Sequence, residues 1–81
     1  MADGVRDVLE YLARELVDDP DAVQVDEAED ERGILLTLRV AEGDMGKVIG
    51  RGGRTARAIR TIVKATGIRR GIHHTGVEIL D

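Results

Sequence analysis

A glycine-rich turn among arginines is the stretch of this chain whose residue types suit the binding of an anion. The turn is Gly50-Arg51-Gly52-Gly53, and it follows the apolar pair Val48 and Ile49. From Met45 to Gly71 there are eight basic residues and no Asp or Glu: Lys47, Arg51, Arg54, Arg57, Arg60, Lys64, Arg69 and Arg70. Glycines let the backbone turn tightly and let a phosphate come close to the amides. The segment therefore predicts a phosphate-binding turn.

The residues after the turn predict an amphipathic helix over 54–66, ended by Gly67. One side is expected to carry Thr55, Ala58, Ile59, Ile62, Val63 and Thr66, and the other Arg54, Arg57, Arg60 and Lys64. Most charged helical faces are simply solvated. This one begins at the glycine turn, where free N–H groups and the helix dipole already favour a negative group. Anion binding is therefore the favoured interpretation.

The rest of the chain predicts the elements that position this turn. Apolar spacing predicts a helix over residues 3–17, with Asp3 as its N-cap, and the run around Pro20 ends it. Residues 22–40 predict a hairpin with its loop at 29–33, and the nearly continuous apolar run 34–40 is expected at the sheet centre, covered on most sides. Asp44 is expected to cap a short helix over 45–49, and residues 72–80 predict a last strand with a kink near Gly76.

The element order α-β-β-α-α-β limits the possible folds. The crossover from the second strand to the third predicts a parallel, right-handed connection, whereas the short hairpin makes the first two strands antiparallel. We therefore expect an α+β fold with a mixed three-stranded sheet and three helices on one face. A chain of 81 residues has room for a single domain, spanning residues 1–81.

Composition excludes several classes of function. The chain has no Ser or Cys, which rules out their nucleophilic mechanisms, and we expect neither an enzyme nor a cofactor. His73 and His74 would point to opposite faces of a strand, so no metal site is predicted. The polar N-terminus and the lack of a long apolar run predict a cytoplasmic protein without a membrane partner.

Charge is divided unevenly along the chain. Residues 1–33 hold twelve acids and three arginines, a net charge of −9. Residues 34–81 hold nine basic residues and four acids, a net charge of +5. Such asymmetry predicts one surface that attracts a polyanion and another that repels it.

The run Val48-Ile49-Gly50-Arg51-Gly52-Gly53 resembles the signature of the KH domain, whose GXXG loop clamps about four nucleotides of nucleic-acid backbone. The element order resembles the type II, bacterial arrangement, and residues 42–60 are similar to the small single-KH-domain proteins called KhpA. Ala56 departs from the general pattern, which often has a larger aliphatic residue there, and is expected to widen the groove.

The resemblance implies which residues contact single-stranded RNA. Gly50, Arg51, Gly52 and Gly53 would hold phosphates, Lys47, Arg54 and Arg57 would add charge, and Ile49 with Val40 and Ile72 would line an apolar groove for bases. It also implies a homodimer, or a heterodimer with a second KH-containing protein. RNA chaperone activity and an influence on cell-wall growth and cell shape are further expectations from the family.

Three alternatives compete with this interpretation. A nucleotide-binding P-loop would need Ser or Thr after Lys47 and glycine at Ala41, and the chain has neither. A helix-turn-helix DNA binder would use helix 54–66 for recognition, yet that helix lacks Asn and Gln for base edges. A structural dimerisation module without RNA affinity stays open.

Overall fold

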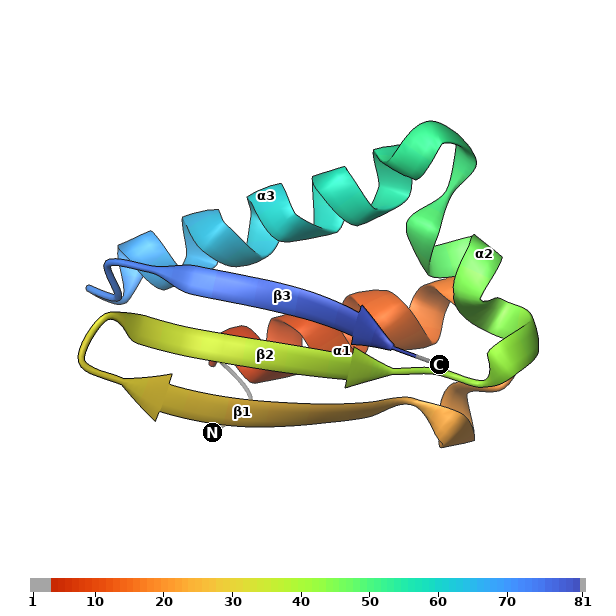
Figure 1. Cartoon of the computed structure of the whole chain (residues 1–81), viewed down its shortest axis with the longest axis horizontal. Coiled ribbons are helices and arrows are strands. Elements are labelled where there is room, and N and C mark those ends of the chain that lie inside the picture. The colour runs from red at the N-terminus through yellow and green to blue at the C-terminus, as the bar shows by residue number, and fades with distance from the viewer. Residues whose placement is uncertain (1–3, 81) are drawn as a thin grey trace.

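The computed structural model describes residues 4–80 and confirms the predicted α+β fold. Its main elements are α1 (Val5–Leu16), β1 (Gln24–Asp30), β2 (Gly33–Arg39), α2 (Met45–Ile49), α3 (Arg54–Arg69) and β3 (Thr75–Leu80). Three single-turn 3-10 helices lie between them: η1 (Pro20–Ala22), η2 (Glu42–Asp44) and η3 (Arg51–Gly53). The strand order is β1-β2-β3, with β1 antiparallel and β3 parallel to β2 (Figure 1).

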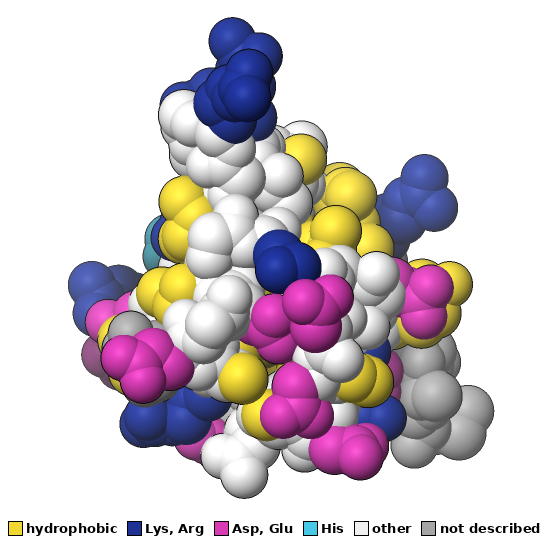
Figure 2. All heavy atoms as spheres, turned by 90° about the vertical axis from the view of Figure 1, so that its right-hand side faces the viewer, with side chains coloured by type: hydrophobic (Ala, Val, Ile, Leu, Met, Phe, Trp, Pro, Cys, Tyr) yellow, Lys and Arg dark blue, Asp and Glu magenta, His cyan; other side chains and the backbone are white. Residues whose placement is uncertain are grey.

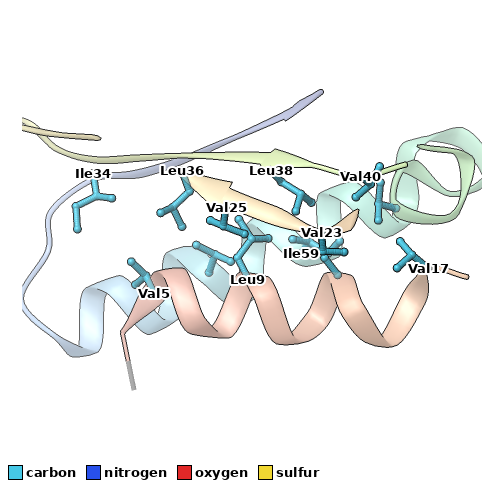
Figure 3. Packing of buried hydrophobic residues seen from close by; sticks show 13 residues of the cluster. Val5, Leu9, Val17, Val23, Val25, Ile34, Leu36, Leu38, Val40 and Ile59 are labelled. Carbon is cyan, nitrogen blue, oxygen red and sulfur yellow. The ribbon is translucent and has the colours of Figure 1, made fainter. Parts of the chain in front are cut away.

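One hydrophobic core lies between the sheet and the helices (Figure 3). From the sheet, Leu36 and Leu38 point towards the helices and have no exposed surface. From the helices, Leu9 of α1 and Ile59 of α3 meet them. Alternate residues of a strand share one face, which is why every second residue of β2 enters this core.

The other face of β2 is open, contrary to the expectation that this strand is covered on most sides. Leu35 keeps 46% of its surface exposed, because all three helices pack on the opposite face of the sheet. The apolar run 34–40 thus forms the central strand, as predicted. This strand is buried on only one of its two faces.

The hairpin loop is shorter than expected, because β1 continues to Asp30 and β2 begins at Gly33. The Asp30 carboxylate accepts hydrogen bonds from the N–H groups of Arg32 (2.8 Å) and Gly33 (3.2 Å). The bond from the Arg32 amide is the main reason why the pKa of Asp30 lies below its ordinary value of 3.8. An ionised side chain therefore organises the turn.

The predicted end of α3 at Gly67 is wrong, because the helix continues to Arg69. A Cβ at Gly67 would stand 2.4 Å from Oγ1 of Thr75, so this glycine allows close packing of helix on strand instead of ending the helix. Gly71, with φ 79°, takes the left-handed position after the helix. β3 consequently starts at Thr75, and its pairing with β2 is unbroken through Gly76, where a kink was expected.

The buried stripe of α3 is rotated from the predicted one. Ala58 and Ile62 are exposed, whereas Ala56, Ile59, Val63 and Gly67 are buried. Ala56, expected to affect the groove, is one of the buried residues of this helix. At the other end of the chain, Gly4 takes the N-cap position of α1, and the expected cap Asp3 lies outside the described residues. Within residues 4–80, none of the helices has the length and apolar character needed to cross a bilayer.

Candidate nucleic-acid interface

The glycine turn connects α2 to α3 at one end of the molecule, at the upper right of Figure 1. Its glycines have positive φ angles: 75° at Gly50, 64° at Gly52 and 76° at Gly53. Residues with a Cβ atom avoid this region because of steric conflict with the backbone. The backbone path of the turn therefore favours glycine at all three positions.

The three glycines differ in what surrounds them. A Cβ at Gly50 would stand 2.2 Å from Oγ1 of Thr55, so Gly50 packs directly on the first turn of α3. A Cβ at Gly52 or at Gly53 would meet nothing within 4 Å. The second half of the turn therefore faces open space, where a ligand can approach the backbone.

The turn also presents free amide groups. The Gly50 N–H donates to the Gly46 carbonyl (2.9 Å), the Gly53 N–H to the Gly50 carbonyl (3.1 Å), and the Arg54 N–H to the Arg51 carbonyl. Among residues 4–80, the N–H groups of Arg51 and Gly52 have no backbone acceptor. They lie at the N-terminal end of a 16-residue helix, whose dipole adds positive potential there.

Three arginines surround these amides without acidic partners. Arg51, Arg54 and Arg57 are exposed, and no ion pair within residues 4–80 involves them. Figure 2 shows basic side chains at the top of this end of the molecule and acidic ones in the lower half. Arg60 lies further along α3 and donates from Nε to the Val77 carbonyl of β3 (3.3 Å). The basic surface therefore continues from the turn towards the edge of the sheet.

Lys47, also predicted for the site, is placed among carboxylates. Its Nζ lies 3.3 Å from Oδ2 of Asp18 and 3.8 Å from Oδ1 of Asp44. Asp44 occupies the N-cap position of α2, but its buried carboxylate makes no capping bond and instead accepts the Asp19 N–H (3.1 Å). Asp44 therefore does not cap α2 but links this helix to the segment that follows α1.

The structure does not bring together the expected apolar groove. Ile49, at the end of α2, is half-buried beside the turn, but Val40 is buried in the core. Ile72 bonds to the Gly67 carbonyl near the far end of α3, about 20 Å from the turn at 1.5 Å per helical residue. Ile79 of β3 is half-buried and packs against the hydrophobic core.

His73 and His74 lie between α3 and β3, outside the strand to which they were assigned. In the part of the chain that the structure describes, no group of three His, Asp or Glu side chains is arranged to hold a metal ion.

Comparisons with known proteins find similar sequences over most of the chain. The family model described as the KhpA/KhpB KH domain matches residues 6–79. A relative from Clostridium acetobutylicum named RNA-binding protein KhpA is 52% identical over 65 residues, which is 80% of this chain and 87% of the relative. A protein of the same name from Mycobacterium bovis is 47% identical over 81 residues, covering 100% of this chain and 96% of the relative.

A solved structure shows the same fold at low identity. Era from Aquifex aeolicus, bound to GDP.AlF4-, superposes with a TM-score of 0.66 and 16% identity. The match covers 94% of this chain and 30% of that one. At this identity the likeness concerns the fold alone.

Proposed function

Because the chain belongs to the KhpA/KhpB family of KH domains, we propose that it is an RNA-binding protein that holds single-stranded RNA backbone at the turn 50–53. The observation that carries the proposal is the pair of free N–H groups at Arg51 and Gly52, beside the open space over Gly52 and Gly53. A GXXG loop of this kind clamps about four nucleotides. The curated relatives named RNA-binding protein KhpA support RNA as the ligand.

Each site residue has a role in this proposal. The amides of Arg51 and Gly52 bind phosphate oxygens, and the guanidinium groups of Arg51, Arg54 and Arg57 supply charge. Gly50 packs the turn against Thr55 of α3. Ile49 offers apolar surface to a base. Lys47 contributes only when its contacts with Asp18 and Asp44 open, because both compete with phosphate for the same ammonium group.

Binding is expected to be weak and tolerant of RNA sequence. Aromatic side chains are the usual stacking platforms for unpaired bases. The only aromatic residue of this chain is Tyr11, which lies on α1 and not at the turn. Recognition therefore relies on backbone contacts, to which an arginine side chain can add some stacking.

We extend the proposal to partners and cellular role on the strength of family membership. The protein, a single KH domain over residues 1–81, acts in the cytoplasm as a homodimer or with a second KH-containing protein. It serves as an RNA chaperone and influences cell-wall growth and cell shape. Light scattering with and without candidate partners tests the assembly, and the morphology of a deletion strain tests the cellular role.

The decisive experiment compares two pairs of Gly→Asp substitutions by fluorescence anisotropy with labelled single-stranded RNA. Gly52→Asp with Gly53→Asp should abolish binding, because carboxylates would then occupy the phosphate position. The control is Gly43→Asp with Gly71→Asp, since both positions also have free space and Gly71 also has a positive φ of 79°. This control changes the net charge equally and should bind within about twofold of wild type, because its charges lie away from the turn and are screened.

Three results would contradict the proposal. Undiminished RNA binding by the variant with Gly52→Asp and Gly53→Asp would show that RNA does not contact the turn. An equal loss in both pairs would assign the effect to net charge alone. Tighter binding of duplex DNA than of single-stranded RNA would favour a helix-turn-helix mode.

A further inference from the structure

Thr55 lies at the base of the turn, in the first turn of α3. Its Oγ1 and its Cβ would stand 2.2 Å and 2.7 Å from a Cβ built on Gly50, so this side chain packs directly against the Gly50 backbone. It is half-buried, one residue beyond the exposed Arg54. Its hydroxyl is therefore held in place next to the turn that carries the free amides.

The hydroxyl of Thr55 differs from those of the other two threonines of α3. Thr61 donates to the Arg57 carbonyl (3.0 Å) and Thr66 to the Ile62 carbonyl (2.9 Å), in each case four residues back. The corresponding carbonyl for Thr55 is that of Arg51, which accepts the Arg54 N–H and not the Thr55 hydroxyl. Among residues 4–80, the Thr55 hydroxyl has no hydrogen-bond partner.

The turn next to this hydroxyl carries donors without a partner. The free N–H groups of Arg51 and Gly52 belong to the same turn, and the guanidinium groups of Arg51 and Arg54 carry no acidic partner within residues 4–80. An anion bound at the turn can accept hydrogen bonds from all of these groups and from the Thr55 hydroxyl.

We propose that the Thr55 hydroxyl donates a hydrogen bond to a phosphate oxygen of the RNA strand held at the turn, and so is a further binding residue of this site. The inference rests on the proposed function, because the acceptor is the bound RNA backbone. It assigns Thr55 to the binding surface, whereas its place in the helical pattern had assigned it to the apolar side of α3.

The test measures RNA affinity for three variants by anisotropy with a labelled single-stranded oligouridylate of about eight nucleotides, twice the length that a KH loop clamps. Thr55→Val keeps the shape of the side chain without the donor, and Thr55→Ser keeps the donor without the methyl group. Thr66→Val is the matched control, since Thr66 is equally half-buried in the same helix but its hydroxyl is already bonded. We expect about tenfold weaker binding for Thr55→Val, the scale of a lost hydrogen bond to a charged group. Thr55→Ser and Thr66→Val should bind like wild type.

The salt dependence separates a lost contact from a damaged turn. A neutral donor releases no counterion, so Thr55→Val should keep the wild-type slope of log affinity against log salt concentration. A turn that no longer holds phosphates would flatten this slope. Wild-type affinity in Thr55→Val, equal weakening in Thr55→Ser or in Thr66→Val, or a flattened slope would each overturn the inference.

Gly52→Asp is measured in the same series to keep the two proposals distinguishable. If Gly52→Asp loses binding while Thr55→Val does not, only the role of Thr55 fails. If Gly52→Asp binds like wild type, the proposed function itself fails.

Discussion

Gly67 of α3 and Thr75 of β3 pack against each other so closely that a Cβ on Gly67 would stand 2.4 Å from the Thr75 Oγ1. Thr75 is buried, and its branched side chain cannot easily move aside. We predict that Gly67→Ala lowers the free energy of unfolding by about 1–3 kcal/mol through overpacking, although alanine normally favours a helix by about 1 kcal/mol. Urea unfolding followed by circular dichroism measures the change.

Two further variants check the cause of this effect. Gly43→Ala is the control, because a Cβ there meets nothing within 4 Å and no loss of stability is expected from crowding. Combining Gly67→Ala with Thr75→Ala should cost less than the sum of the two single changes, since the smaller residue removes the clash. Additive losses would refute the proposed contact.

The arginines of the turn and Lys47 should differ in their contribution to RNA binding. Three to five phosphate contacts give an expected slope of about −2 to −4 for log affinity against log salt, at roughly −0.7 per contact on a single strand. Arg51→Ala should reduce the steepness by about 0.7. Lys47→Ala should change it less, because Asp18 and Asp44 already lie beside this ammonium group. Equal changes for the two variants would show that these carboxylates do not compete with RNA.

The buried carboxylate of Asp44 should matter more for stability than the exposed one of Asp18. Asp44→Ala leaves the Asp19 N–H without its acceptor and should cost about 1–3 kcal/mol of unfolding free energy. Asp18→Ala should cost at most about 0.5 kcal/mol, because its side chain is 80% exposed and surface ion pairs contribute little. Asp44→Asn, whose amide oxygen can still accept the bond, should lie between the two. Thermal and urea unfolding rank the stabilities of the three variants. An equal loss for both alanine variants would contradict a stabilising role of the Asp44–Asp19 hydrogen bond.

The Asp30 turn predicts a contribution to stability that depends on pH. The pKa of Asp30 is lower in the folded chain, mainly through the Arg32 amide, so the folded state binds fewer protons than the unfolded state. The contribution is therefore complete above the ordinary pKa of 3.8 and is lost as the pH falls through the lower folded value. Asp30→Ala should be less stable than wild type at about pH 6, and the difference should shrink towards about pH 2. A gap that is constant with pH would show that ionisation plays no part.

Much of the fold could be predicted because periodicity reports burial directly. The spacing in α1 and the alternation of Val23 and Val25 placed a helix and a strand correctly on one core. What failed depended on tertiary contacts. Gly67 looked like a helix end, yet it is needed for contact with Thr75, which lies eight positions later and on another element. Leu35 looked buried, yet which faces of a sheet are covered is decided by where the helices pack.

The turn itself could be predicted because its requirement is local: a backbone with positive φ at Gly50, Gly52 and Gly53 favours glycine whatever surrounds it. The contacts made by the residues beside the turn could not be predicted from the sequence. Lys47 belongs to the same basic run as Arg51, and only the folded chain brings Asp18 beside it. Thr55 was hidden for a similar reason, since hydroxyls that bond within a helix and those that do not are identical in sequence.

The separation of charge across the sheet also affects events before any contact is made. α3 holds five basic residues and no acid, β1 holds four acids and no basic residue, and the two lie at opposite borders of the molecule (Figure 1). This arrangement is a permanent electric dipole. A polyanion exerts a torque on it that turns α3 towards the polyanion. A protein with a net charge of −4 can thus be oriented, and not only repelled, by an approaching nucleic acid.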